Sequence, residues 1–181
     1  MTQGQVWDKE LVHAELDRAR DDFRWLLDQA SEADLARPTN GTRWDNEQLL
    51  FHMLFGYMIV RRLLGLVRLF GRLPVGASRG YARLLDAGSR PFDLINYLGP
   101  CAAVHIYGHR RIAAKLDRVI ASLHRRLDQE TSADLARGMY YPARWDPFFD
   151  DYMTLADIYR YPTQHYDFHR RQLTLGAASD P

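Results

Sequence analysis

The chain contains one stretch twice, and this repeat decides the fold. Residues 27–37 read LDQASEADLAR and residues 127–137 read LDQETSADLAR, with eight identities in eleven positions. The triplet Arg-Trp-Asp follows each copy, at residues 43–45 and again at residues 144–146. Helical patterns lie before and after each copy, so each half of the chain reads as two helices joined by a loop. The repeat therefore predicts two similar helical hairpins.

Outside the repeat, apolar residues recur every three or four positions in four long segments. These segments predict helices over about residues 8–29, 45–70, 101–129 and 147–175. No segment of useful length alternates as a strand would. We interpret Trp44 and Trp145 as fillers of the hairpin corners, and we expect Pro162 to kink the last helix one turn before His165. The fold class is therefore all-α, a four-helix bundle.

The segment 71–98 between the second and third helices breaks the helical pattern with repeated glycine and proline. We predict an irregular crossover connection there, with at most a short helix near residues 81–85. A long crossover makes the third helix run parallel to the second, which gives the order up-down-down-up. A length of 181 residues suits a single domain over 1–181.

Composition excludes several classes of protein. With 46% hydrophobic residues the chain can bury a core, and 24 basic against 23 acidic side chains give a net charge of +1, too little to attract nucleic acid. A single cysteine excludes a disulfide scaffold. The N-terminus lacks the basic and apolar regions of a signal peptide, and the most apolar run, residues 49–60, is shorter than the roughly 20 residues of a membrane span. We expect a soluble, cytoplasmic protein that contacts neither membrane nor nucleic acid.

Histidines gather on the faces that the helical pattern places inside the bundle. Of the seven histidines we interpret His13 and His124 as ordinary residues. Buried imidazoles need polar partners, so several on interior faces indicate a site rather than plain packing. In the up-down-down-up order, the starts of the second and third helices meet the end of the fourth at one pole. This predicts a histidine-lined pocket formed by His52, His105, His109, His165 and His169.

The chemistry of such a cluster is metal binding. Histidines four residues apart share a helix face, so His165 and His169 can bind one ion, and His105 and His109 have the same spacing. A third imidazole from another helix would complete a site with open coordination positions, as in catalytic zinc centres. Imidazole also suits nickel, iron and copper. The spacing leaves open which pair provides the ligands.

Two segments around these histidines resemble the DinB/YfiT-like superfamily. Residues 44–52, WDNEQLLFH, are similar to the start of that family's second helix, and residues 165–173, HYDFHRRQL, are similar to its closing motif. The resemblance extends from the first helix to about Leu175. It implies an up-down-down-up bundle, often a homodimer, that holds a divalent metal, zinc or nickel foremost. The ligands that it implies are His52, His165 and His169.

The resemblance also assigns supporting residues. Gln172 occupies the position of the motif's glutamine and is expected to orient the site, whereas Phe168 stands where many members have a further histidine. His105 and His109 match no family ligand, so they remain candidates for pocket lining beside the alternative of plain packing.

Three other residues lie near the predicted pocket in the sequence. Tyr107 could offer a hydroxyl group, although a packing role is the simpler alternative. Cys101 would open the third helix, where a helix N-terminus lowers the pKa of a thiol, or it could be a small buried apolar residue. Asp167 lies two residues from His165 and from His169, which turns it away from their face, so we do not expect it to act as a base.

The resemblance implies a metal-dependent enzyme similar to thiol-dependent S-transferases. The metal would activate a low-molecular-weight thiol, mycothiol or bacillithiol, or a water, for attack on an electrophilic small molecule. Hydrolysis is one alternative. Another is a non-catalytic stress protein of the same fold that binds a metal or a small molecule. A third, in which the basic second helix binds a membrane or a partner helix, is poorly supported.

Overall fold

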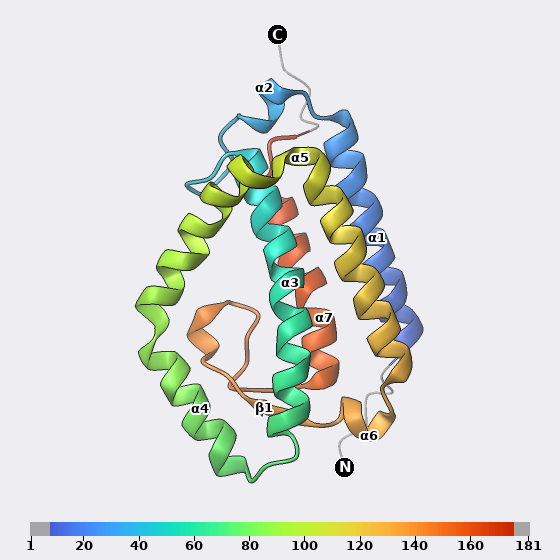
Figure 1. Ribbon diagram of the computed structural model, residues 1–181, viewed down its shortest axis with the longest axis vertical. Helices are drawn as coiled ribbons and strands as arrows, with labels where there is room; N and C mark the ends of the chain where they lie inside the picture. The colour runs from blue at the N-terminus through green and yellow to red at the C-terminus, as the bar shows by residue number, and fades with distance from the viewer. Residues whose placement is uncertain (1–7, 176–181) are drawn as a thin grey trace.

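Within residues 8–175, which the computed structural model describes apart from the side chains of residues 90–92, 105 and 108–110, four long helices carry most of the chain. In Figure 1, α1 rises on the right and α3 descends through the middle, with α7 rising beside it. The helix α5 rises on the left, turns at the top and descends beside α1. The long helices are α1 (Lys9–Gln29), α3 (Asn46–Phe70), α5 (Ser89–Gln129) and α7 (Leu155–Arg170).

The first two long helices begin and end where the sequence predicts. Asp8 caps α1, since its carboxylate accepts a hydrogen bond from the backbone N–H of Glu10 at 2.9 Å. Asp45 caps α3 by accepting from the N–H of Gln48 at 2.8 Å, and the Gln48 side chain reaches back to the N–H of Asp45. The predictions of helices over residues 8–29 and 45–70 are confirmed.

The two copies of the repeat form the same local structure. Ser31 and Thr131 each cap a short helix, and the carboxylates of Asp34 and Asp134 accept a hydrogen bond from the backbone N–H of the capping residue. The repeat therefore specifies a tight turn after a long helix in each half of the chain. These short helices are α2 (Glu32–Leu35) and α6 (Ser132–Leu135).

The predicted irregular connection over 71–98 is wrong, because most of this segment is helical. It forms α4 (Val75–Ala87) and the first part of α5, which begins at Ser89 and continues through Pro100. Tertiary packing outweighs the weak helix propensity here. For example, the ring of Tyr81 on α4 stacks on that of Phe70 with centroids 4.8 Å apart. The expected start of the third helix after Gly99-Pro100 is wrong for the same reason.

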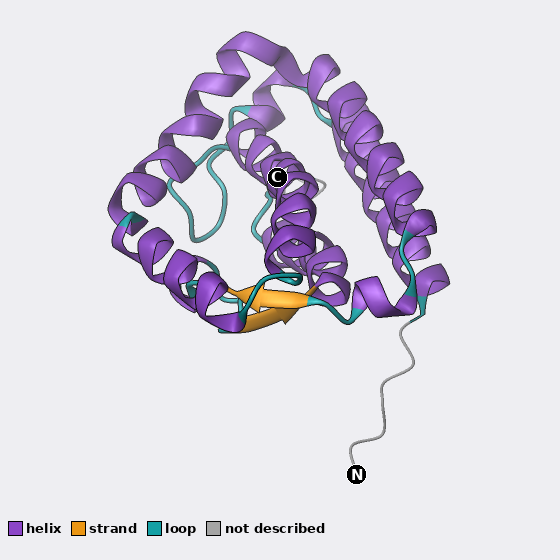
Figure 2. Cartoon of the chain, turned by 60° about the horizontal axis from the view of Figure 1, so that its bottom comes forward, coloured by secondary structure: helices purple, strands orange, loops and turns teal. Residues whose placement is uncertain are grey.

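The predicted start of the last helix near Asp146-Pro147 is also wrong. Irregular chain and the second strand of a small antiparallel sheet follow Asp146, and α7 begins only after Thr154, whose side chain accepts from the N–H of Asp157. Figure 2 shows the two strands at the base of the molecule, beside the ends of the helices. Pro162 lies inside α7, which continues past it to Arg170. The additional elements are η1 (Ala143–Trp145), β1 (Gly138–Tyr140) and β2 (Tyr152–Thr154).

The helix α3 forms the centre of the core and packs against both α5 and α7. By length and composition alone it could cross a membrane, but 56% of its most apolar window is buried inside the fold. Packing on two sides explains why this helix is apolar around most of its circumference. Its fully buried residues include Leu49, Leu50, Met53, Leu54, Tyr57, Val60 and Leu64.

Candidate metal centre

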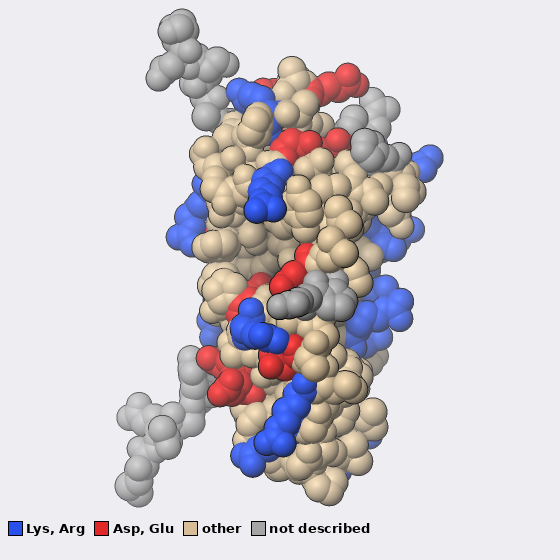
Figure 3. Space-filling model, turned by 90° about the vertical axis from the view of Figure 1, so that its left-hand side faces the viewer, with Lys and Arg blue, Asp and Glu red and all other residues tan. Residues whose placement is uncertain are grey.

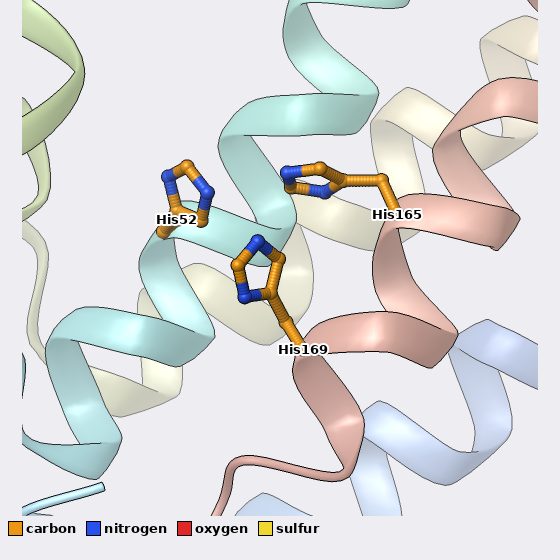
Figure 4. Close-up of side chains that lie close together, drawn as sticks. All are labelled: His52, His165 and His169. Carbon is orange, nitrogen blue, oxygen red and sulfur yellow. The ribbon is translucent and has the colours of Figure 1, made fainter. Parts of the chain in front are cut away.

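Three histidines from two helices converge beside the core. His52 lies in the second turn of α3, and His165 and His169 lie one turn apart near the end of α7. Figure 4 shows the three rings facing one another across the space between the two helices. The ring centroids lie 4.9 Å apart for His52 and His165, 4.7 Å for His52 and His169, and 4.5 Å for His165 and His169. One nitrogen from each ring lies within 4.8 Å of the others, so the group could hold a metal ion.

Burial keeps these imidazoles neutral. His52 and His165 are only 5% and 4% exposed, and His169 is partly buried. Loss of hydration, with a smaller contribution from His169, lowers the pKa of His52 to about 3. Burial also lowers the pKa of His165 and of His169. Each ring therefore carries a lone pair at neutral pH, which is the form that binds a cation.

The hydrogen bonds of the cluster leave its nitrogens available for a ligand. The Nδ1–H of His169 donates to Oε1 of Gln172 at 2.6 Å, so the Nε2 lone pair of His169 stays free. Nδ1 of His52 and Nδ1 of His165 are buried with no hydrogen-bond partner among the described residues. Such atoms cost free energy unless something binds them. Three neutral imidazoles, two of them with unpartnered nitrogens, fit a divalent cation such as zinc or nickel.

The position of α3 against the cluster depends on a glycine. A Cβ atom added to Gly56 would lie 3.0 Å from Nδ1 of His165 and 3.3 Å from its Cε1. A side chain at this position would press on the His165 ring. The close approach of α3 to His165 therefore requires Gly56.

A partly buried carboxylate that the sequence did not indicate as a site residue lies beside the cluster. Oδ2 of Asp146 is 3.7 Å from Nε2 of His165 and accepts a hydrogen bond from the hydroxyl of Tyr161 at 2.8 Å. Oδ1 accepts from the N–H of Phe148 at 2.9 Å. Burial raises the pKa of Asp146, although both hydrogen bonds oppose the shift. The sequence does hold a signal for the role of Asp146. Thr154 and Asp157 have the spacing of a capping box, so the last helix can begin at Thr154 and Asp146 is not needed as its cap.

The cluster opens into a cavity of about 240 Å³ with mostly aromatic and aliphatic walls. Trp44 stacks on His52 with ring centroids 4.5 Å apart, and the indole N–H of Trp145 donates to Oγ of Ser89 at 2.9 Å. Both tryptophans line the cavity, so their interpretation as corner fillers alone is wrong. The two copies of the Arg-Trp-Asp triplet thus place one indole each at the same site.

Two candidate residues from the sequence lie elsewhere. Cys101 is inside α5 rather than at a helix start, and its thiol donates to the carbonyl of Tyr97 at 3.3 Å. The expected place of Cys101 at the start of a helix is therefore wrong. Tyr107 is 38% exposed and packs against the ring of Phe51 with centroids 5.9 Å apart. Neither Cys101 nor Tyr107 lines the cavity.

The remaining candidates are not part of the described cluster. The side chains of His105 and His109 lie outside the described residues, so their predicted role in the pocket is neither supported nor contradicted. Both carboxylate oxygens of Asp167 accept from Nη2 of Arg18 on α1, at 2.9 Å for Oδ1 and 2.8 Å for Oδ2. This ion pair lies on the side of α7 away from the cluster. This agrees with the expectation that Asp167 is turned away from the face of the two histidines.

A second histidine pair joins α1 to α5. Nδ1 of His13 and Nδ1 of His124 lie 2.5 Å apart, and Nε2 of each ring faces a carboxylate at 3.1 Å, Asp128 for His13 and Asp17 for His124. Neither ring lines the cavity. Their role in the described structure is a polar contact between two helices.

Fold and site together define a class: mostly helical proteins in which a central helix and the last helix present three histidines to an apolar cavity. A family model for the DinB superfamily matches residues 15–173. The chain therefore belongs to the DinB superfamily, and the predicted resemblance is confirmed. No curated protein and no solved structure matches the chain significantly.

Proposed function

We propose that this protein is a metal-dependent enzyme in which His52, His165 and His169 hold a divalent cation. The reaction is attack by a low-molecular-weight thiol such as mycothiol or bacillithiol, or by a water, on an electrophilic small molecule. The observation that carries this proposal is the meeting of three neutral imidazoles at the wall of a cavity large enough for a small molecule.

Each residue of the site has a separate role in this reaction. The three imidazoles bind the cation, and Gln172 fixes the ring of His169 through its Nδ1–H. A cation bound there supplies Lewis acidity, which lowers the pKa of a thiol or a water. Oδ2 of Asp146 lies 3.7 Å from Nε2 of His165, where it would accept the proton that the thiol or water loses. The aromatic walls exclude bulk water from the electrophile.

We propose the family's arrangement for the rest of the molecule. The helices α1, α3, the second half of α5 and α7 are the four bundle helices in the order up-down-down-up, and the chain acts in the cytoplasm. The directions of the helices in Figure 1 support this order. The helical crossover formed by α4 and the first half of α5 then brings the start of α3 and the end of α7 to one pole, where His52 meets the α7 histidines.

We propose a homodimer that forms through the crossover helices. The side of the molecule seen in Figure 3 carries large areas without Lys, Arg, Asp or Glu. Large exposed apolar patches are typical of interaction surfaces. On α4 and the first half of α5, more than half of the side chain is exposed for Val75, Leu84, Leu94, Ile95 and Ile106.

Elemental analysis tests the metal site. Wild-type protein reconstituted with Zn²⁺ or Ni²⁺ and then desalted should hold close to one equivalent, whereas His165→Ala and His169→Ala should hold almost none. His124→Ala is the matched control, because it removes a partly buried histidine outside the cavity and should retain the metal. Equal occupancy in all four proteins would contradict the proposal.

A second experiment tests the reaction. The metal-loaded protein is incubated with mycothiol, bacillithiol or glutathione and a panel of electrophiles, and S-conjugates are sought by mass spectrometry. Conjugates that form with wild-type protein and not with His169→Ala support thiol transfer, and hydrolysed electrophiles support attack by water. If the protein binds the metal but converts none of the electrophiles, the result would contradict an enzyme and would favour a non-catalytic binding protein of the same fold.

A further inference from the structure

We propose that Trp44 is a positioning residue for the metal centre: its indole ring fixes the plane of the His52 ring, and the first half of α5 in turn fixes the indole. This inference deepens the proposed function, on which it rests for the bound cation. The contacts that carry it lie within the protein itself, so part of its test does not require the metal.

The ring of His52 lacks the kind of hydrogen bond that holds its neighbour His169. The Nδ1–H of His169 donates to Oε1 of Gln172 at 2.6 Å, which fixes the rotation of that ring. Nδ1 of His52 is buried and has no hydrogen-bond partner in the part of the chain that the structure describes. A ligand ring that rotates freely loses this freedom when it binds a cation, which weakens binding. A contact other than a hydrogen bond is therefore needed to hold His52 toward the site.

The indole of Trp44 provides this contact by stacking. Its ring lies on that of His52 with centroids 4.5 Å apart and an angle of 29° between the two planes. Rotation of the imidazole would drive its edge into the indole face, so the stack restricts the ring. An imidazole that binds a divalent cation also becomes more positive, and the electron-rich face of an indole attracts positive charge. The stack therefore favours both the orientation and the metal-bound form of His52.

Hydrogen bonds fix the backbone at Trp44. Its N–H donates to Oγ1 of Thr42 at 3.0 Å, and its carbonyl accepts from the N–H of Thr39 at 3.1 Å and from Oγ1 of Thr39 at 2.7 Å. The next residue, Asp45, caps α3, the helix that carries His52. The indole therefore starts from a fixed place relative to the ligand that it supports.

The first half of α5 holds the other end of the indole. Nε1–H of Trp44 donates to the carbonyl of Tyr97 at 3.2 Å, and the rings of Trp44 and Tyr97 stack with centroids 6.0 Å apart and an angle of 22° between their planes. The indole thus contacts both the crossover and a candidate metal ligand. A movement of this part of α5 would change the support of His52, which couples the crossover to the metal centre.

Two substitutions separate stacking from the filling of space. Trp44→Phe keeps an aromatic face but lacks the N–H, whereas Trp44→Leu keeps an apolar side chain without an aromatic face. Zn²⁺ affinity, measured by competition with a chromophoric chelator, should fall about tenfold or more in Trp44→Leu, as for other groups that support metal ligands. In Trp44→Phe it should fall only about two- to threefold, because one exposed hydrogen bond is lost. Equal affinities in the two variants would overturn the inference, since a space filler would not distinguish them.

Tryptophan fluorescence provides a readout that does not depend on Trp44→Leu. Binding of Zn²⁺ changes the charge of the His52 ring directly against the indole, so the emission of Trp44 should change on titration. Most of this change should be lost in Trp44→Phe. Trp25→Phe is the matched control, because it changes a tryptophan of α1 that is 51% exposed and does not line the cavity, and it should keep the change. The same change in Trp44→Phe as in wild-type protein would contradict the inference.

NMR of the metal-free protein separates failure of this inference from failure of the proposed function. The ring current of the indole should shift the carbon-bound ring protons of His52 upfield, and His52→Asn identifies their resonances by their disappearance. The shift should be present in wild-type protein and absent in Trp44→Leu. If wild-type protein binds no Zn²⁺, the proposed function fails, and the His52 resonances still decide whether Trp44 fixes the ring. Unshifted resonances in wild-type protein would overturn the inference.

Discussion

The protonation state of each histidine in the cluster follows from its burial. An exposed histidine titrates near pH 6.5, but burial lowers the pKa of His52 to about 3 and lowers that of His165 and His169 as well. Protons therefore do not compete with a cation for these rings at neutral pH. In the metal-free protein, however, the unfolded chain takes up protons that the folded chain does not.

This difference predicts how pH affects the metal-free protein. Below about pH 6.5 the unfolded state binds more protons than the folded state, so stability falls as the pH falls, by about 1.4 kcal/mol per pH unit for each such histidine. Thermal melts with a chelator present should give a constant Tm between pH 8 and 7 and a declining Tm below about 6.5. His52→Asn should make the decline shallower. Parallel curves for the two proteins would contradict this explanation.

Gly56 offers a test of the packing of α3 against the cluster. In Gly56→Ala the new Cβ would press on the ring of His165, so metal affinity should fall about tenfold or more, as when other supporting groups of metal sites are changed. Gly65→Ala in the same helix is the control, because nothing lies within 4 Å of its added Cβ. It should gain about 0.5–1 kcal/mol of stability and keep its metal affinity. Competition with a chromophoric chelator measures the affinity, and similar affinities in the two variants would argue against the role of Gly56.

Single residues of the site differ in how far the sequence reveals them. The spacing of His165 and His169 places them on one helix face, and the resemblance to the DinB family adds His52 and Gln172 to the group. Asp146 lies in irregular chain around the small sheet, where no periodicity indicates which way a side chain points. Its position follows from tertiary packing.

At the scale of elements, the repeat specifies two matching turns. The hydroxyls of Ser31 and Thr131 accept from the N–H groups of Asp34 and Asp134, both at 3.1 Å, and hydrogen bonds from the two capping residues lower the pKa of both carboxyl groups. The stabilisation from these carboxylates is present above the ordinary pKa of aspartate and is lost as the pH falls through the lowered values.

These caps predict equal effects in the two halves. Ser31→Ala and Thr131→Ala should each lower the free energy of unfolding by about 1 kcal/mol at pH 7. Ser132→Ala, one residue beyond the second cap, is the control and should have little effect. Denaturant unfolding measures all three. A large loss in one half only would show that the repeat no longer has the same structural role in both halves.

The helices whose bounds the sequence predicted correctly have an aspartate cap directly before the apolar stripe. α1 and α3 have an aspartate cap and a regular pattern, and both begin one residue after the cap. α4 and α5 have no side-chain hydrogen bond at their caps, and α5 contains Pro100, so local sequence argues against helices that tertiary contacts nevertheless stabilise.

At the scale of the whole molecule, α4 and the first half of α5 carry the exposed apolar residues of the proposed dimer face. A dimer through their apolar face predicts a solution mass twice that of one chain. Ile95→Glu combined with Leu98→Glu should convert it to a monomer, because charges would be buried in the interface. Leu11→Glu, which changes an exposed leucine of α1, is the control. Analytical ultracentrifugation measures the mass, and a wild-type monomer would end the dimer proposal.

The aspartates of the two Arg-Trp-Asp triplets, Asp45 and Asp146, have different roles in the structure. Asp45 caps the first turn of α3, a role that asparagine can also fill, whereas Thr154 caps α7 and Asp146 lies at the cavity wall. There Asp146 accepts hydrogen bonds from the N–H of Phe148 and the hydroxyl of Tyr161 instead of capping a helix. Asp45→Asn should therefore be nearly neutral, whereas Asp146→Asn removes the one carboxylate that the described residues contribute to the cavity wall.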